Sequence, residues 1–227
     1  MAFQPIIDTE HNQVFAYEAL VRGLNDEPAR FILDQVTADN RYLFDQACRV
    51  KAIQKAAELG IDCYLSINFL PNAVYNPEHC LRTTLQAAKR YGFPKEQLIL
   101  EITEGERIDN HDHVLNIINE YKRQGLRTAI DDFGAGYAGL NLLAEFQPDL
   151  LKIDMNLVRG VDRDRTRQAI IRGIVEVCDE LLIPIIAEGI EAVAEYETLS
   201  HYGIHLFQGY YFARPGYQRS PMAHLTH

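Results

Sequence analysis

The chain has 227 residues, of which 47% are hydrophobic and 24% are charged, a composition typical of globular proteins. Its formal net charge of −10 argues against a duplex-nucleic-acid binder, which would present a basic surface. The sequence contains no run of 18 apolar residues that would predict a membrane span, and its start lacks the basic and apolar regions of a secretory signal.

Short apolar runs alternate with longer amphipathic segments along the chain. The apolar runs, which we predict to be strands buried on both faces, are residues 15–21, 63–69, 98–102, 128–130, 150–153, 183–187 and 205–207. The opening segment 3–8 is a candidate for one more strand, which would turn through residues 11–13 and pair with the first of these runs as a hairpin.

Four of the intervening segments have the apolar spacing of helices: residues 41–60, 111–124, 164–181 and 192–202. Within 41–60 the apolar stripe expected to face the core is Leu43, Ala47, Val50, Ile53 and Ala57. Within 164–181 it is Ile170, Ile174, Val177 and Leu181.

The alternation of strands and helices predicts a parallel sheet. No linker divides the chain, so we expect a single domain over residues 1–227 with a loop-like tail at 214–227. Six or seven strand–helix units favour a modified TIM (β/α)8 barrel with one antiparallel strand at the entry; a doubly wound open sheet is the alternative. The four cysteines contain no CxxC pair, which favours free thiols and a cytoplasmic location.

Polar residues interrupt or follow most of the predicted strands. They are Glu18, Asn68, Glu101, Glu104, Asp131, Asp132, Lys152, Asp154, Glu188 and Gln208. In a parallel barrel the carboxyl ends of the strands open on one face, so we expect these side chains to converge. Helix capping accounts for some acids at such positions, and Asp154 could be one of them. It does not account for Glu18, Glu101 or Lys152, because a charge within an apolar run must be paired or bound to metal.

Clustered carboxylates and one amide, without cysteine or histidine, suit Mg²⁺ or Mn²⁺. The adjacent Asp131 and Asp132 could serve two ions, which is the usual arrangement for phosphodiester hydrolysis. Lys152 could then orient water or neutralise developing charge. A Schiff-base aldolase is the alternative for a lysine on a barrel strand, but the surrounding carboxylates would keep that lysine protonated.

The segment 132–139 (DFGAGYAG) holds three glycines around one aromatic residue. The glycines fit a loop that closes over a ligand or packs at an interface, and equally a tight connection that needs positive φ. Its position directly after the paired aspartates favours a functional role.

Eight segments, in order and spread over essentially the whole chain, resemble the EAL phosphodiesterase family. They are residues 3–6 (FQPI), 17–22 (YEALVR), 66–68 (SIN), 100–104 (LEITE), 131–134 (DDFG), 151–154 (LKID), 187–191 (AEGIE) and 208–210 (QGY). The resemblance implies a modified TIM barrel with one antiparallel strand. It also implies a phosphoric diester hydrolase specific for cyclic di-GMP, which yields linear pGpG and uses two Mg²⁺ or Mn²⁺ ions in bacterial signalling.

The same resemblance implies a role for each matching residue. The first ion would be held by Glu18, Asn68, Glu101 and Asp131, and the second by Asp131, Asp132 and Glu188. Glu188 would also be the base towards the attacking water, and Lys152 would contact that water or the phosphate. Substrate would be bound by Leu20, Arg22 and Gln208, and Glu104 would anchor the glycine loop.

Two segments depart from the family pattern. Ala135 and Ala138 replace the usual Thr and Ser, and the stretch 23–42 is short; together they resemble the branch often fused to flavin-based blue-light sensors, although no sensory domain is present in this sequence. The family also implies a homodimer. The alternative functions are a degenerate domain that binds the nucleotide or a protein without turnover, and a metal-independent aldolase or isomerase. Because every matching ligand position is filled, we expect an active enzyme.

Overall fold

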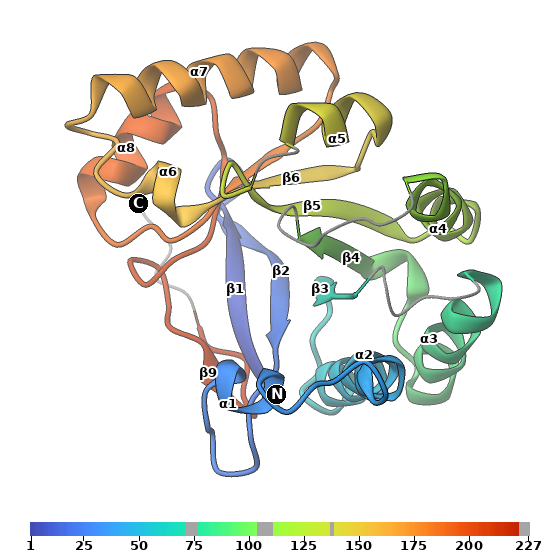
Figure 1. Cartoon of the computed structure of the whole chain (residues 1–227). Coiled ribbons are helices and arrows are strands. Elements are labelled where there is room, and N and C mark those ends of the chain that lie inside the picture. The colour runs from blue at the N-terminus through green and yellow to red at the C-terminus, as the bar shows by residue number, and fades with distance from the viewer. Residues whose placement is uncertain (71–76, 104–110, 137–138, 223–227) are drawn as a thin grey trace.

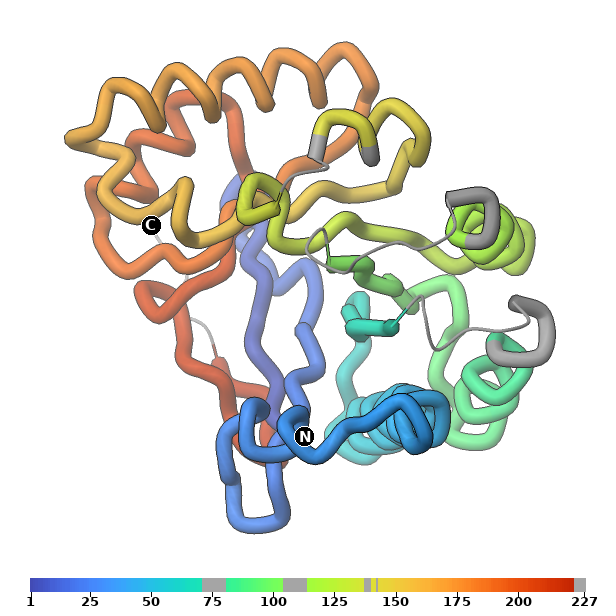
Figure 2. The backbone as a smooth tube through the Cα atoms, viewed as in Figure 1, coloured from blue at the N-terminus to red at the C-terminus, as the bar shows by residue number. Residues whose placement is uncertain are grey.

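The computed structural model describes residues 1–70, 77–103, 111–136 and 139–222 (Figures 1 and 2). Within them nine strands form one sheet. The strands are β1 (Ala2–Asp8), β2 (Gln13–Leu20), β3 (Tyr64–Asn68), β4 (Leu98–Thr103), β5 (Arg127–Phe133), β6 (Leu150–Ile153), β7 (Ile185–Ala187), β8 (Leu206–Phe207) and β9 (Gly216–Tyr217). Strands β2 to β8 pair in parallel in chain order, and β1 closes the ring by antiparallel pairing with β2 and β8. The predicted barrel with one antiparallel strand is confirmed, and the open sheet is wrong.

The reversed direction of β1 comes from a tight turn after Asp8, where Asn12 takes a left-handed φ of 51°. The resulting hairpin pairs Gln4 with Glu18 and Ala2 with Leu20. The first residues of β1 therefore lie beside the last residues of β2, at the carboxyl ends of the parallel strands. The short β9 pairs with Ala2 and Phe3 on the outer side of this hairpin.

Helices surround the barrel on its outside (Figure 1). They are α1 (Ala29–Leu33), α2 (Arg41–Glu58), α3 (Pro77–Tyr91), α4 (His111–Arg123), α5 (Gly139–Glu145), α6 (Met155–Val158), α7 (Arg165–Glu180) and α8 (Val193–His201), with a 3₁₀ turn at Lys95–Gln97. Four of them match the predicted helices. The helix α3 was not predicted, although Pro77 at its first position and Gly92 at φ +71° beyond its end are typical boundary residues.

The predicted apolar stripes of α2 and α7 match the buried faces only in part. Ile53 and Ile174 are buried as predicted, and Val50 and Ala57 pack against the core while partly buried. In α2, Leu43 is 67% exposed, and the buried face is Asp45, Arg49, Ala52, Ile53 and Ala56. In α7, Ile170, Val177 and Leu181 are exposed, whereas Ile171, Ile174, Val175 and Cys178 are buried. The error in α2 has a clear cause, because that helix buries an ion pair on its core face and an apolar pattern cannot reveal such a face.

Two hydrophobic clusters build the core. The larger one lies between the strands and the helices, and Leu143 and Phe146 of the segment after the glycine loop belong to it. The smaller one fills the barrel interior with Ile6, Ala16, Ile99, Ala129, Leu150, Ile186 and Leu206. Among the described residues, no helix combines the length and the apolar character needed to cross a bilayer.

Candidate active site

The polar residues of the site lie one layer above the apolar cluster inside the barrel. Alternate residues of a strand face the same side, so the residue two positions after an inward apolar side chain also points inward. Ala16 is followed in this way by Glu18, and Ile99 by Glu101. The same spacing relates Ala129 to Asp131, Leu150 to Lys152, Ile186 to Glu188 and Leu206 to Gln208. The strands thus bring together predicted residues that are separated by up to 190 positions.

Lys152 lies at the centre of the carboxylates. Its Nζ is 2.6 Å from Glu188 Oε1, 2.9 Å from both Glu101 Oε1 and Asp131 Oδ1, and 3.6 Å from Glu18 Oε2. The lysine side chain is only 1% exposed. A buried ammonium group is costly unless it is paired, and here four carboxylates compensate it.

Asp131 and Asp132 are consecutive residues, yet both carboxylates reach the site. A regular strand would turn one of them away. Asp132 instead has a φ of +55°, and the pairing of β5 with β6 shifts register between Ile130 and Phe133. This bulge breaks the alternation at a position where a non-glycine residue is strained, an arrangement that often accompanies a functional site.

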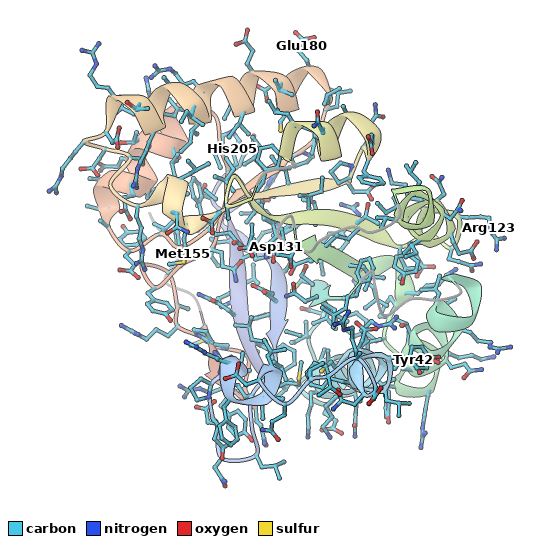
Figure 3. All side chains as sticks on the ribbon, in the orientation of Figure 1. Tyr42, Arg123, Asp131, Met155, Glu180 and His205 are labelled. Atoms are coloured by element: carbon cyan, nitrogen blue, oxygen red, sulfur yellow. The ribbon has the colours of Figure 1, made fainter. Side chains whose placement is uncertain are left out.

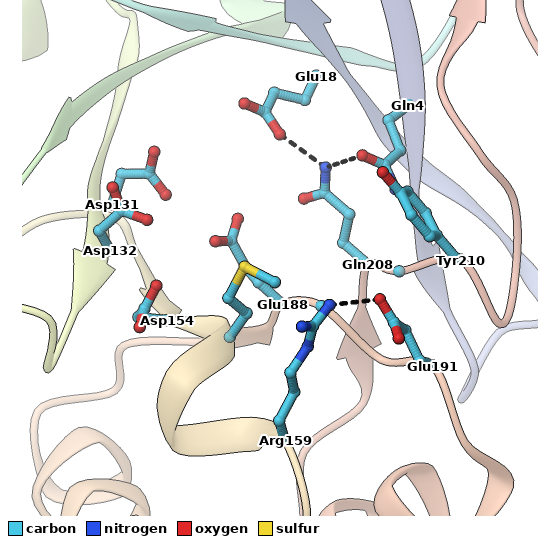
Figure 4. A pocket seen from close by; sticks show the side chains of 13 residues that line it. Gln4, Glu18, Asp131, Asp132, Asp154, Arg159, Glu188, Glu191, Gln208 and Tyr210 are labelled. Carbon is cyan, nitrogen blue, oxygen red and sulfur yellow. Dashed lines mark hydrogen bonds and ion pairs between the residues drawn. The ribbon is translucent and has the colours of Figure 1, made fainter. Parts of the chain in front are cut away.

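Neutral side chains orient the carboxylate of Glu18. Asn68 Nδ2 donates to Glu18 Oε1 at 3.1 Å, and Gln208 Nε2 donates to Glu18 Oε2 at 2.6 Å. Gln208 Nε2 also lies 3.4 Å from Gln4 Oε1, on the reversed strand (Figure 4). On the other side of the cluster, Ser66 Oγ donates to Glu101 Oε1 at 2.6 Å.

Two groups of acids have the geometry of cation sites. In each group the oxygens lie within 4.8 Å of one another; the groups are Glu18, Glu101 and Asp131, and Asp131, Asp132 and Glu188. Within the described part of the chain, the buried Glu101 Oε2 has no hydrogen-bond partner. An unsatisfied carboxylate oxygen is costly unless a cation or water compensates it, so the donor set fits a hard divalent ion.

The crowded negative charge changes the pKa values of the site. Burial raises the pKa of Glu101 to about 8, with Glu18 and Asp131 adding to the rise and Lys152 opposing it. Burial also raises the pKa of Glu188 well above its usual range, and that of Asp132 to about 6 with help from Asp131. Burial lowers the pKa of Lys152, but the surrounding carboxylates outweigh it and hold the ammonium charged.

We expect the metal-free protein to lose stability as pH rises from about 4.5 to about 8. In that window folded Glu101, whose ordinary pKa is 4.5, still binds a proton that the unfolded chain has released, so the free energy of unfolding falls with pH. Urea unfolding in EDTA at pH 5 and pH 8 measures this difference. Glu101→Gln should reduce the dependence, and a stability that is constant or rises across the window would contradict the assignment.

The remaining predicted residues differ in whether they lie at the site. Leu20 lines a cavity beside Asp131, and Asp154 caps α6 by accepting from the Asn156 amide at 2.9 Å. Arg22 lines neither cavity that contains the acids: its Nη1 donates to the Val21 carbonyl at 2.8 Å and its Nε is 3.8 Å from Asp26. Glu104 lies outside the described residues.

A model of the EAL domain matches residues 1–215 of the chain. The chain belongs to the EAL domain family. Among curated relatives, this EAL domain is 37% identical over 215 residues to the blue light- and temperature-regulated antirepressor BluF of Escherichia coli, covering 94% of the chain and 53% of BluF. It is 34% identical to the probable cyclic di-GMP phosphodiesterase PdeD of the same organism, covering 93% of the chain and 40% of PdeD. The chain thus spans about half the length of these relatives or less.

Solved structures of similar proteins contain ligands. A standalone EAL protein from Vibrio cholerae in its c-di-GMP-bound form is 53% identical, with a TM-score of 0.96, and the match covers 99% of this chain and 94% of that one. BlrP1 of Klebsiella pneumoniae, in a manganese and cyclic di-GMP complex, is 35% identical with a TM-score of 0.91, over 96% of this chain and 56% of that one.

Several polar residues around the EAL site were not singled out from the sequence. Gln4 and Ser66 are buried and contact site residues directly, and the two-residue spacing along β1 and β3 could have identified both. At the rim, Arg159 forms an ion pair with Glu191 (Figure 4). Arg159 directly follows α6 and Glu191 lies in the segment after β7, and the strand pattern does not predict that these two segments approach each other.

Proposed function

We propose that this EAL domain hydrolyses cyclic di-GMP to linear pGpG with two divalent cations, Mg²⁺ or Mn²⁺. The observation that carries the proposal is the convergence of Glu18, Glu101, Asp131, Asp132 and Glu188 around Lys152 at one end of the barrel. The names and bound ligands of the related proteins support the same substrate and metal-dependent chemistry.

Each side chain would have a defined task. Glu18, Asn68, Glu101 and Asp131 would hold one ion, and Asp131, Asp132 and Glu188 the other, with Asp131 shared. Bound in pairs, such ions activate water and stabilise charge on a phosphodiester. Glu188 would act as the general base towards the attacking water, a role that requires its carboxylate to be ionised. Lys152, held charged, neutralises negative charge that develops on the phosphate oxygens.

The shape of the surface supports a two-part substrate. Cavities of about 250 and 310 Å³ meet at the acids, and both are lined by Asp131 and Asp132. The first is lined by Gln208 and Tyr210 among others (Figure 4), and the second by Leu20. A cyclic dinucleotide could place one phosphodiester at the acids and extend into both cavities. Arg22 would have to leave Asp26 to reach a phosphate.

The test is product formation from cyclic di-GMP with Mg²⁺ or Mn²⁺, with and without EDTA, followed by chromatography. We expect linear pGpG only when the cation is present. Nucleotide binding without turnover would instead support a non-hydrolytic regulator. This alternative is worth testing because the relative BluF is named an antirepressor. Turnover that persists in EDTA would overturn the metal mechanism and favour the metal-independent alternative.

We further propose that the protein is cytoplasmic and that two copies associate. The described cysteines Cys48, Cys63 and Cys178 are unpaired, as expected in a reducing compartment. Leu140 and Ile170 expose apolar surface on α5 and α7, beside the glycine segment. Recovery in a periplasmic fraction would contradict the location, and a monomer mass by light scattering at micromolar concentration would contradict the association.

A further inference from the structure

Helix α2 carries a buried ion pair close to the site. Asp45 and Arg49 are 3% and 1% exposed, and Asp45 Oδ2 is 2.7 Å from Arg49 Nη2. Arg49 Nη1 donates to Thr84 Oγ1 of α3 at 2.7 Å. The second oxygen of the carboxylate, Asp45 Oδ1, accepts from the backbone amide of Leu70 at 3.0 Å. The Asp45–Arg49 pair thus joins α2 to α3 and to the segment that follows β3.

Leu70 follows Asn68 by two residues, and each of the residues 68–70 forms a hydrogen bond to another part of the protein. Asn68 Nδ2 donates to Glu18 Oε1 at 3.1 Å, and the amide of Phe69 donates to the Glu101 carbonyl at 3.1 Å. The contact from Asp45 to the Leu70 amide is the next hydrogen bond along the chain. Asp45, Asn68 and Leu70 also line the same cavity.

Stability alone does not explain a charged pair at this position. Burying two charges costs desolvation, and replacing a buried ion pair by apolar residues of similar volume is often neutral or stabilising. On α2 the neighbouring core positions Ala52, Ile53 and Ala56 are apolar. An apolar pair could therefore fill this face equally well, but it could not accept the hydrogen bond from Leu70.

We propose that Asp45 is a positioning residue for the cation site: its carboxylate fixes the backbone at Leu70 and so keeps the Asn68 side chain beside Glu18. The inference rests on the proposed function for the identity of the ion. Arg49 serves this role indirectly, because its guanidinium group pairs with Asp45 Oδ2 and leaves Oδ1 directed at the Leu70 amide. Without the anchor, the end of β3 can shift and Asn68 loses its alignment with the first group of acids.

Two matched double variants separate positioning from stability. Asp45→Ala/Arg49→Leu and Asp45→Asn/Arg49→Leu both remove the ion pair, but only the asparagine keeps an acceptor for the Leu70 amide. The affinity for Mn²⁺ is measured by calorimetry, alongside thermal unfolding and the kcat and KM for cyclic di-GMP. We expect the alanine variant to bind Mn²⁺ about 10- to 100-fold more weakly, the usual effect of losing a residue that orients a metal ligand. The asparagine variant should retain affinity near wild type.

The ranking of the two variants decides the inference. A buried amide left partly unpaired beside the introduced leucine would make the asparagine variant the less stable one, so metal affinity and stability should rank in opposite order. Equal Mn²⁺ affinities, or affinities that follow the unfolding temperatures, would overturn the positioning role. Thr84→Val, which alters the pair without touching Leu70, should leave Mn²⁺ affinity unchanged.

Two further outcomes are informative. If either double variant does not fold, Asp45→Glu keeps the charge for Arg49 but displaces the acceptor, and unchanged Mn²⁺ binding in it would overturn the inference. If the wild-type protein binds Mn²⁺ without hydrolysing cyclic di-GMP, the proposed function fails while the affinity comparison still tests Asp45. A wild-type protein that binds neither Mn²⁺ nor Mg²⁺ would overturn both.

Discussion

Glu18→Ala is expected to lower kcat/KM for cyclic di-GMP by more than about 100-fold, since substituting even a second-layer partner of a metal ligand costs about 10- to 100-fold. Glu18 belongs to the first group of acids and is 3.6 Å from Lys152. It is also the acceptor for Asn68 and Gln208, so its loss removes an oxygen ligand and the orientation of both amides. The measurement is steady-state pGpG formation at saturating Mn²⁺.

Two further variants make this experiment specific. Glu18→Gln preserves the size of the side chain and can still accept a hydrogen bond, but it lacks the charge, so we expect it to fold normally and remain nearly inactive. Glu180→Gln makes the same change at an exposed position of α7, far from the site, and should be fully active (Figure 3). A Glu18→Ala protein with more than a tenth of wild-type activity would remove Glu18 from the proposed ligand set.

Lys152→Met should destabilise the metal-free protein and abolish turnover. Removing one partner of a buried ion pair costs about 3–5 kcal/mol, and this lysine compensates four carboxylates at 2.6–3.6 Å. Because a divalent cation can take over that compensation, Mn²⁺ should stabilise the variant more than it stabilises the wild type. Urea unfolding at pH 8, in EDTA and in Mn²⁺, compares the two proteins.

The choice of pH is important for the Lys152 experiment. At low pH the carboxylates can bind protons once the lysine is gone, and the destabilisation would be partly hidden. Lys51→Met, at an exposed position on α2, is the matched control and should unfold like wild type in both solutions. Equal Mn²⁺ stabilisation of the Lys152 variant and the wild type would mean that the lysine and the ions do not share the same carboxylates.

Most of the barrel and the convergence of its acids could be predicted because side chains alternate between the two faces of a strand, so the sequence of a strand has a period of two residues. Residues such as Ala129 and Asp131 differ by two positions, so a charged residue inside an apolar run marks the inward face above the core. The bulge at Asp132 was not predictable in the same way. Its positive φ is a property of the folded backbone, although the Asp-Asp pair indicated that both carboxylates had a role.

The sequence did not predict side-chain positions that are determined by contacts outside the strands. The core face of α2 contains Asp45 and Arg49, and their mutual compensation becomes visible only when α3 and the end of β3 are in place. The position of Arg22 likewise depends on the segment after β2, where Asp26 competes for the guanidinium group. Neither arrangement follows from hydrophobic spacing.

The reversed direction of β1 affects how such a domain can be connected to a preceding domain. In an all-parallel barrel the first strand begins at the end opposite the catalytic face. Here Ala2 pairs with Leu20, so the strand begins at the catalytic face itself and passes Gln4 beside Glu18 on its way down. A module joined ahead of this strand would emerge next to the substrate entrance. A displacement of that module would be transmitted to Glu18 through the backbone pairing of β1 with β2 alone, and no other strand of the barrel would have to move.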